Sequence, residues 1–405
     1  MTDHGDGADD VGDAGERGFE TQAVRAGEEP FVRPGSAGET GDVVSPIHLA
    51  STFAMETVGE PSQEYKYSRL GNPTRNALET RLAVLDGAAY GLAFGSGTAA
   101  TTCFCLSVLE PGDRVLAFDS LYGGTRVLLD DLISGFGIDV EYVDATDPEN
   151  VAAAVTPETA LLWMETPTNP LLKLCDIEAL ADLANGNDCL LAVDNTFASP
   201  YFQQPLALGA DAVVYSTTKF LNGHSDSVGG AVTTDDAALA ENVRHVQEYG
   251  VGAMLAPFDC YLTLRGTKTL PVRMDRHAHN TARLAAFLDE APAVTEVHYP
   301  GLESHPQHDL AARQMDGFGG VLSFEIDGGT DEAQALLGEL ELFDVAVSLG
   351  SVESLIEHPA SMSASYISAA DRRAAGITDG LIRVPVGIER AEDLIADLQR
   401  GLEAL

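Results

Sequence analysis

Short apolar segments recur between residues 90 and 215, and helical patterns lie between most of them. The segments are rich in Val, Leu and Ala and are bounded by polar or turn residues, as buried strands are. They cover residues 90–94, 114–118, 140–143, 160–164, 190–193 and 211–215. Strands that alternate with helices form a mostly parallel sheet with helices on both faces. This pattern predicts an α/β fold.

A second unit is predicted after these strands. A long helix over about residues 264–283 connects to it. Beyond this helix, apolar segments alternate with helices as in a smaller α+β domain, and they lie at residues 320–326, 344–350 and 381–389. We therefore divide the chain into a large domain over residues 71–268 and a C-terminal domain over residues 269–405.

The N-terminal residues have a different composition. Residues 1–17 are acidic and Gly-rich, which predicts a disordered tail, and residues 18–70 favour an extended arm. The start of the chain lacks the apolar core of a signal peptide, and no apolar run approaches membrane-spanning length. The five cysteines form no C-x-x-C pair, and several lie within apolar runs, as reduced core thiols do. We therefore expect a cytoplasmic protein without a membrane partner.

The chain is strongly acidic. It has 63 Asp and Glu residues against 23 Lys and Arg residues, a formal net charge of −40. This charge repels nucleic acids and anionic membranes, so we expect binding to neither. The acidic residues are dispersed along the chain. This dispersion favours a halophilic protein, because concentrated counterions screen the self-repulsion.

The last strand of the large domain ends in a distinctive polar sequence. Ser216, Thr217 and Thr218 follow residues 211–215, and Lys219 comes next. Small hydroxyl groups can anchor a phosphate, and a lysine amine can form a Schiff base with the aldehyde of pyridoxal 5'-phosphate (PLP). On this stretch alone, a solvated lysine at the end of a strand explains the pattern equally well.

Two earlier strands also end in an ionisable residue, Glu165 and Asp194. Because ligands bind at the carboxyl ends of strands in open α/β sheets, these carboxylates and Lys219 are expected to converge on one pocket. A carboxylate after a buried run needs a partner, and the protonated pyridine nitrogen of PLP would supply one for Asp194. The alternatives are a helix N-cap or Asx-turn at Asp194 and a simple turn after Glu165.

A glycine-rich loop, Gly95-Ser96-Gly97-Thr98, precedes a helix predicted over residues 98–109. Free N–H groups at the start of such a helix favour a phosphate. A nucleotide-binding G-x-G-x-x-G loop is the alternative, but Ala100 occupies the third glycine position. The histidine pairs at 277 and 279 and at 305 and 308 lack metal-ligand spacing, so no metal site is predicted.

A series of distinctive motifs occurs in order along the chain. They are YKYSRLGNPT at 65–74, GSGT at 95–98, DSLYGGT at 119–125, ETPTNP at 165–170, VDNTFASP at 193–200, STTK at 216–219, GHSD at 223–226, SLG at 348–350, HPAS at 358–361 and Arg383. Through these motifs the chain resembles, from about Phe19 to the C-terminus, the transsulfuration (Cys/Met metabolism) family of fold-type I PLP enzymes. The resemblance implies PLP as cofactor, a large domain with a mostly parallel sheet, and a smaller C-terminal α+β domain.

The resemblance also implies a role for individual residues in PLP binding. Lys219 would form the Schiff base, Asp194 would pair with the pyridine nitrogen, and Tyr122 would stack on the ring. The phosphate would be held by the amides of Gly97 and Thr98 and by the hydroxyls of Ser216 and Thr218.

A neighbouring subunit completes the phosphate site in this family, through a Tyr and an Arg. Here these residues would be Tyr67 and Arg69, so the arm over residues 18–70 would contribute to the neighbouring subunit. The resemblance therefore implies a homo-oligomer, usually a dimer of dimers.

The implied substrates are small amino acids derived from homoserine or homocysteine. Arg383 would bind their α-carboxylate, with Asn169 and Ser348 beside it. The substrate amine would release Lys219, which would then remove the Cα proton, and Tyr122 would act as an acid or base toward the γ substituent. A lyase ends this sequence with a 2-oxo acid and ammonia, whereas a synthase adds a thiol at Cγ.

Three positions, Val347, Val127 and Gly124, bear on the choice within the family. Cystathionine-specific relatives commonly carry an acidic residue at the position of Val347 and an Arg at the position of Val127. Methionine γ-lyases tend to have an apolar residue at the position of Val347 but usually have Cys at the position of Gly124. This chain also has Ala364 where a His is common in the family. We favour cystathionine γ-synthase or γ-lyase activity over methionine γ-lyase or O-acetylhomoserine sulfhydrylase activity. A non-catalytic PLP-fold binding protein is the remote alternative.

We predict that salt stabilises this protein. Raising NaCl from 0.1 M to molar concentration shortens the screening length from about 10 Å to about 3 Å, so repulsion among the acidic side chains weakens. The thermal unfolding midpoint, followed by circular dichroism, should rise by at least about 5 °C. A parallel titration with sucrose controls for general stabilisation by excluded solutes. Equal midpoints in dilute buffer and molar salt would contradict the expectation.

Overall fold

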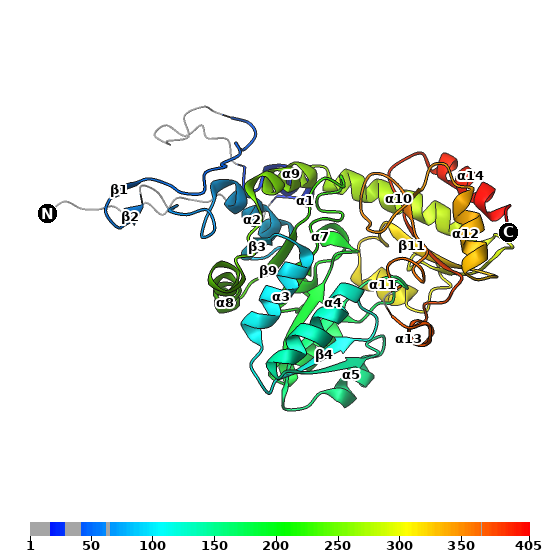
Figure 1. Ribbon diagram of the computed structural model, residues 1–405, viewed down its shortest axis with the longest axis horizontal. Helices are drawn as coiled ribbons and strands as arrows, with labels where there is room; N and C mark the ends of the chain where they lie inside the picture. The colour runs from blue at the N-terminus through cyan, green and yellow to red at the C-terminus, as the bar shows by residue number, and fades with distance from the viewer. Residues whose placement is uncertain (1–16, 29–41, 62–64, 366) are drawn as a thin grey trace.

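The computed structural model describes residues 17–28, 42–61, 65–365 and 367–405. The predicted disordered tail over residues 1–17 lies outside these ranges except for Arg17. Figure 1 shows the described chain as a large body, a C-terminal part beside it, and an N-terminal arm that projects away from both.

A seven-stranded sheet forms the centre of the large body, in the order β3-β9-β8-β7-β6-β4-β5. Its strands are β3 (Tyr90–Phe94), β4 (Arg114–Phe118), β5 (Asp139–Val143), β6 (Thr159–Glu165), β7 (Leu190–Asp194), β8 (Ala212–Tyr215) and β9 (Gly230–Thr234). The strands from β4 to β8 pair in parallel, whereas β9 pairs antiparallel with both β3 and β8. The predicted α/β fold with a mostly parallel sheet is confirmed.

Strand β9 was not predicted from the sequence. Its residues, GAVTT, are small or polar and follow a glycine, so they carry no apolar signal of their own. In the structure all five are buried between β3 and β8. The close packing of neighbouring segments, rather than the hydrophobicity of β9 itself, explains this strand.

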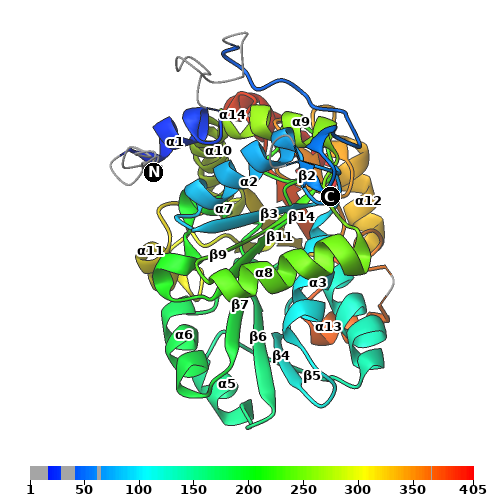
Figure 2. The same cartoon turned by 90° about the vertical axis from the view of Figure 1, so that its left-hand side faces the viewer.

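Helices cover the sheet and bury its strands on both faces. They include α2 (Pro73–Leu85), α3 (Gly97–Val108), α5 (Pro148–Ala154), α6 (Ile177–Gly186) and α8 (Ala237–His245). Helix α2 packs on β3, α6 packs on β7, and α3 packs on β8, β9 and α8 (Figure 2). Strand residues such as Trp163 and Phe118 are consequently fully buried. Such two-sided burial holds the carboxyl ends of the strands in fixed positions.

Capping residues start the helices where the sequence indicates. Asn72 accepts the backbone N–H groups of Thr74 and Arg75 at 2.9 and 3.4 Å, which begins α2 at Pro73. Ser96 accepts the N–H of Ala99 at 3.0 Å and so begins α3 one residue later. The N-terminus of α3 is therefore fixed directly after β3.

Shorter elements complete the large body. They are α4 (Gly123–Val127), α7 (Ser199–Phe202), 3-10 turns at Ser134–Phe136 and Pro205–Leu208, and π-helical turns at Leu128–Ile133 and Val246–Val251. Helix α4 follows β4 directly, so its first turn lies close to the carboxyl end of that strand.

The long helix expected at residues 264–283 is two helices, α9 (Pro257–Thr267) and α10 (Leu270–Asp289). Pro271 occupies the first turn of α10, and because its nitrogen has no hydrogen it favours the start of a new helix. Arg273 donates to the backbone oxygens of Gly266 and Phe220 at 2.9 and 2.7 Å. It thereby satisfies a carbonyl at the end of α9 and joins the helix break to the segment after Lys219.

The C-terminal part contains a three-stranded antiparallel sheet in the order β10-β11-β14. Its elements are β10 (Val294–His298), α11 (His308–Gln314), β11 (Val321–Ile326), α12 (Thr330–Gly338), β12 (Asp344–Val345), β13 (Leu355–Ile356), α13 (Ala369–Ala374), β14 (Leu381–Pro385) and α14 (Ala391–Leu402). The predicted smaller α+β unit is confirmed. The apolar segment at 344–350 is strand only at its first two residues, because the chain turns at Ser348, where φ is +89°.

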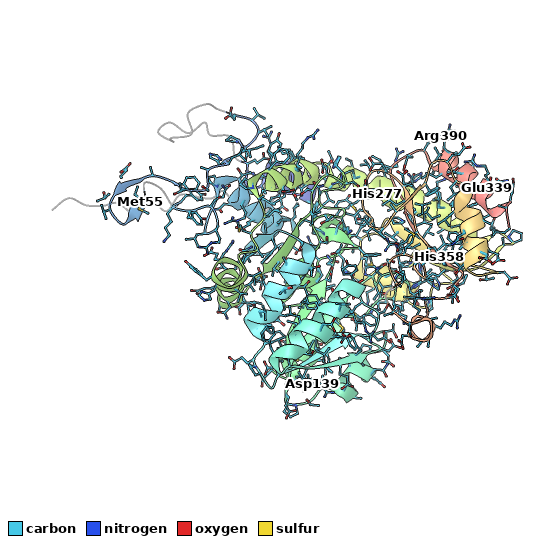
Figure 3. All side chains as sticks on the ribbon, in the orientation of Figure 1. Met55, Asp139, His277, Glu339, His358 and Arg390 are labelled. Atoms are coloured by element: carbon cyan, nitrogen blue, oxygen red, sulfur yellow. The ribbon has the colours of Figure 1, made fainter. Side chains whose placement is uncertain are left out.

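At the start of residues 18–70, α1 (Phe19–Arg25) is a short helix that the sequence did not predict, and it packs on α2 and α10 instead of projecting from the molecule. The arm continues to a two-stranded hairpin of β1 (Met55–Thr57) and β2 (Glu60–Pro61). Met55 lies near the tip of this projection in Figure 3, and Leu49 and Val58 are also exposed, at 73% and 101%. In the described part of the chain, no helix is long and apolar enough to cross a membrane.

Candidate active site

A cavity of about 600 Å³ lies at the carboxyl ends of the central strands. Its walls come from the segments that follow β3, β4, β6, β7 and β8, from the loop between β12 and β13, and from β14. Ten of the predicted site residues line it: Gly97, Thr98, Tyr122, Asn169, Asp194, Ser216, Thr218, Lys219, Ser348 and Arg383. Tyr67 and Arg69 do not. Residues that are far apart in the sequence therefore meet at the carboxyl ends of the strands, as expected for an open α/β sheet.

Lys219 follows β8 and reaches into this cavity. Its Nζ donates a hydrogen bond to Ser348 Oγ at 2.5 Å. Burial, and then the nearby charge of Arg383, lower the pKa of Lys219 to about 8, against a smaller opposing effect of Glu357. A buried amine that loses its proton near neutral pH can attack a carbonyl or accept a proton, which a solvated surface lysine does far less readily.

The SLG motif approaches Lys219 through its glycine. Gly350 has φ +81°, and a Cβ there would lie 2.5 Å from the Phe220 nitrogen and 2.8 Å from the Lys219 carbonyl carbon. Any side chain at this position would therefore push the motif away from Lys219. This close approach places Ser348 beside the lysine amine.

Asp194 and Glu165 lie side by side at the ends of β7 and β6, as paired residues in the sheet register. Burial raises the pKa of Asp194, and burial followed by the charge of Asp194 raises the pKa of Glu165 to about 8. Asp194 Oδ1 also accepts the N–H of Thr196 at 3.0 Å. The Asx-turn considered for Asp194 is therefore present, and the same carboxylate lines the cavity.

The glycine-rich loop follows β3, which is an edge strand of the sheet, whereas the two carboxylates end β7 and β6, further toward its other edge. The N-terminus of α3, at Gly97 and Thr98, lines the cavity with Ser216 and Thr218. A Cβ at Gly97 would lie 3.0 Å from the Cβ of Ser216, so glycine permits this contact. Thr218 is held in turn by Gly229, whose N–H it accepts at 3.0 Å.

Arg383 extends from β14 into the cavity and is held by three groups. Its guanidinium donates to Asn169 Oδ1 and to the Ser348 carbonyl, both at 2.7 Å, and lies 3.1 Å from Glu357 Oε1. Arg383 Nε is buried and has no hydrogen-bond partner among the described residues. The guanidinium is therefore held in one orientation, and its Nε–H bonds to none of the described residues.

Glu357 was missed by the sequence analysis. It is fully buried, pairs with Arg383, and accepts a hydrogen bond from Ser363 Oγ at 2.8 Å. A signal for it existed, because Glu357 follows the apolar pair Leu355–Ile356, as Glu165 and Asp194 follow their strands. The signal is weak, because a two-residue apolar run cannot be told from a loop.

Tyr122 lies at the cavity mouth, at the start of α4, with 51% of its surface exposed. A Cβ at Gly124 would overlap the ring of Tyr122. A cysteine at this position would therefore force the ring to move. The two other positions that bear on substrate choice, Val127 and Val347, also line the cavity and are 45% and 55% exposed.

Tyr67 and Arg69 lie outside the cavity of their own chain. Tyr67 is 45% exposed, and the Arg69 guanidinium lies 5.5 Å from its ring centroid and 5.8 Å from that of Tyr249. Arg69 also donates to the Glu248 carbonyl. Tyr67 is thus exposed, whereas Arg69 is half-buried against Tyr249 and the Glu248 carbonyl.

Two buried histidines, His277 and His358, have hydrogen-bond partners of their own. His277 is buried beside the Val386 carbonyl, and burial lowers its pKa to about 4. His358, of the HPAS motif, bonds through its two ring nitrogens to Ser361 Oγ and the Asp379 carbonyl, at 2.8 and 2.9 Å. Both are labelled in Figure 3. Within the described ranges, no group of three or more His, Cys, Asp or Glu residues could hold a metal ion.

The residues that line the cavity fit the chemistry of PLP. A helix N-terminus and two hydroxyl residues can hold a phosphate, a buried carboxylate can pair with a pyridine nitrogen, and a buried amine can react with an aldehyde. The arrangement on a parallel sheet defines the class of fold-type I PLP enzymes.

Comparisons with known proteins agree with this class. The sequence pattern of the Cys/Met metabolism PLP-dependent enzymes matches residues 20–403. Cystathionine γ-lyase of Sus scrofa is 48% identical over 387 residues, which are 95% of this chain and 94% of that protein. Cystathionine γ-synthase of Mycobacterium bovis is 47% identical over 394 residues, which are 97% and 99% of the two chains.

Solved structures give the same result. The crystal structure of metB from Corynebacterium glutamicum has a TM-score of 0.92 and 45% identity, covering 97% of this chain and 99% of that one. Cystathionine γ-lyase from Lactobacillus plantarum, complexed with L-serine, has a TM-score of 0.90 and 43% identity, covering 96% and 99%. This chain belongs to the Cys/Met metabolism family of PLP-dependent enzymes.

The lowered pKa of Lys219 predicts a specific pH dependence of its reactivity. Below about pH 8 the amine is mostly protonated and unreactive, and above it the amine is mostly free. In PLP-free protein, brief labelling with acetic anhydride should therefore rise with pH to half its maximum near pH 8. Mass spectrometry would follow the Lys219 peptide, with exposed Lys66 as internal standard. Half-maximal labelling near pH 10.5 would contradict the expectation.

Proposed function

We propose that this enzyme acts at Cγ of amino acids derived from homoserine or homocysteine, as a cystathionine γ-synthase or γ-lyase. The observation that carries the proposal is a single cavity that joins a buried amine, Lys219, to a buried guanidinium, Arg383. Both cystathionine enzymes appear by name among relatives that match nearly the full length of the chain. The cavity thus supports an amino-acid substrate, and the relatives support transsulfuration.

PLP, when bound, withdraws electrons from the Cα of an amino acid and makes its proton removable. Lys219 is the residue that would form the covalent link to the cofactor and then move the Cα proton. Its pKa of about 8 keeps part of the population uncharged at neutral pH, as a base requires. Ser348 Oγ, at 2.5 Å from Nζ, orients the amine toward the cavity.

Asp194 and the N-terminus of α3 would hold the two ends of the cofactor. Asp194 would pair with its pyridine nitrogen, and the amides of Gly97 and Thr98 would bind its phosphate with Ser216 and Thr218. Tyr122, whose ring is half exposed at the cavity mouth, would stack on the cofactor ring. Its phenol group would also exchange a proton with the leaving or entering thiol.

Arg383 would bind the substrate α-carboxylate. Asn169 and the Ser348 carbonyl fix its guanidinium, and Glu357 balances its charge in the buried site. The planar guanidinium of Arg383 and the planar α-carboxylate of the substrate can then form paired hydrogen bonds. These bonds would hold the Cα–H bond of the substrate in one orientation.

A second candidate, methionine γ-lyase or O-acetylhomoserine sulfhydrylase activity, is favoured by the apolar wall at Val127 and Val347. An uncharged γ substituent suits this wall better than a second zwitterion. Methionine γ-lyase activity is disfavoured, because the Tyr122 ring occupies the space that the Cys usual in methionine γ-lyases would need at Gly124. The balance favours the cystathionine enzymes, and the substrate assay below separates the two.

The position of Tyr67 and Arg69 outside the cavity of their own chain supports a homo-oligomer in which each arm serves a neighbouring subunit. Both side chains lie away from the cavity of their own chain, and exposed apolar residues accompany them along the arm. In the proposed dimer of dimers they would complete the partner's phosphate site. A cytoplasmic location is proposed as well, because all five cysteines are free and buried.

A substrate panel in high salt tests the proposed reaction. Cystathionine should release a 2-oxo acid, or an O-acyl homoserine with cysteine should form a thioether, and Lys219→Ala should reduce either rate by at least about 10²–10⁴-fold. Methionine and homocysteine, and sulfide in place of cysteine, complete the panel. Release of 2-oxobutyrate from methionine but not from cystathionine would instead select the second candidate.

Subunit complementation tests the role of the arm. Lys219→Ala and Arg69→Ala proteins should each be nearly inactive alone. In mixed oligomers, one of the two sites of each heterodimer contains both native residues, so roughly a quarter of wild-type activity should return on random pairing. Mixing Lys219→Ala with Lys219→Arg controls for exchange alone. Absence of recovery, with hetero-oligomers demonstrated by tagged subunits, would rule out the shared site.

A further inference from the structure

Glu165, at the end of β6, bonds to two different loops of the cavity. Its side chain is buried, with 3% of the residue exposed. Oε2 accepts the backbone N–H of Tyr122 at 2.7 Å, and Oε1 accepts the backbone N–H of Asn169 at 2.9 Å. Tyr122 lies in the loop after β4 and Asn169 in the loop after β6, so one carboxylate joins the two loops.

Each of these loops contributes one side chain to the cavity lining, Tyr122 or Asn169. The Tyr122 ring lies at the cavity mouth, and the Asn169 amide oxygen accepts a hydrogen bond from Arg383 at 2.7 Å. The loops also meet directly, since Ser120 Oγ donates to Thr168 Oγ1 at 3.1 Å. Glu165, together with the Ser120–Thr168 bond, therefore links the position of the Tyr122 ring to that of the Arg383 guanidinium.

The location of Glu165 is electrostatically unfavourable. It is buried next to a second carboxylate, Asp194, and Arg383 offsets only part of the repulsion. The two N–H donors are satisfied by the two oxygens of one carboxylate, which an amide or an apolar side chain of the same size cannot reproduce. Packing alone thus does not account for a carboxylate here.

We propose that Glu165 is a positioning residue, which holds the Tyr122 loop and the Asn169 loop so that PLP and the substrate α-carboxylate are bound in one geometry. This inference rests on the proposed function, because it takes Tyr122 and Arg383 as the groups that contact cofactor and substrate. Glu165 itself acts through the backbone of Tyr122 and Asn169.

Glu165→Gln, measured above about pH 8 where the wild-type side chain is ionised, tests the proposal with the least change in shape. The amide keeps one acceptor but turns an NH₂ group toward the other backbone N–H, so one loop loses its bond. Loss of a buried acceptor weakens the associated binding by about 5- to 100-fold. We expect the Kd for PLP, from absorbance titration of PLP-stripped protein, and the KM for the amino-acid substrate to rise together, with a smaller change in kcat.

Thr159→Val is the matched control. Thr159 lies at the other end of β6, is equally buried at 3%, and accepts the N–H of Thr156 at 3.0 Å. Its replacement removes one buried acceptor from the same strand without touching the cavity. It should lower the thermal unfolding midpoint and leave the Kd for PLP and the KM at their wild-type values.

The outcomes separate the inference from the proposed function. Wild-type Kd and KM in folded Glu165→Gln, or equal losses in Thr159→Val, would overturn the positioning role. If Glu165→Gln does not fold, Glu165→Asp takes its place: its side chain is one methylene shorter, which withdraws the carboxylate from the Tyr122 and Asn169 N–H groups, so the Kd for PLP and the KM should again rise together. A wild-type protein whose PLP absorbance does not depend on Lys219 would instead overturn the proposed function.

Discussion

The parallel pairing of β4, β6, β7 and β8 is the constraint on which the site depends. Parallel strands direct all of their carboxyl ends to one edge, so the residues that follow them meet although they are far apart in sequence. At that edge two carboxylates, Glu165 and Asp194, lie side by side in the sheet register. Their repulsion is tolerated because backbone N–H groups, Arg383 and the proposed cofactor can compensate for it.

Sequence reasoning predicted the parts of the fold that rest on local patterns. Continuous apolar runs located the parallel strands, because strands buried on both faces have little polar alternation. An ionisable residue follows three of these runs, and this pattern alone predicted that Glu165, Asp194 and Lys219 share one site, as they do. The roles of Arg383 and Ser348 came only from the resemblance, since neither follows a strand of the large domain.

Other features depend on contacts between distant segments, which no local pattern contains. Strand β9 exists because β3 and β8 flank it, and the break before α10 is completed by Arg273 bonds to Gly266 and Phe220. Glu357 was missed although a two-residue strand precedes it, because so short a run is indistinguishable from a loop. The double contact of Glu165 is likewise invisible in sequence, because it joins loops 43 and 4 residues away.

The central claim is that Lys219, one of four lysines in the chain, is the residue that links to PLP. Borohydride reduction of the PLP-loaded protein converts a Schiff base into a stable secondary amine, and peptide mass spectrometry then locates it. The account predicts a phosphopyridoxyl group on Lys219. A modification on Lys66, Lys173 or Lys268 instead, or none on any lysine of PLP-loaded protein, would contradict it.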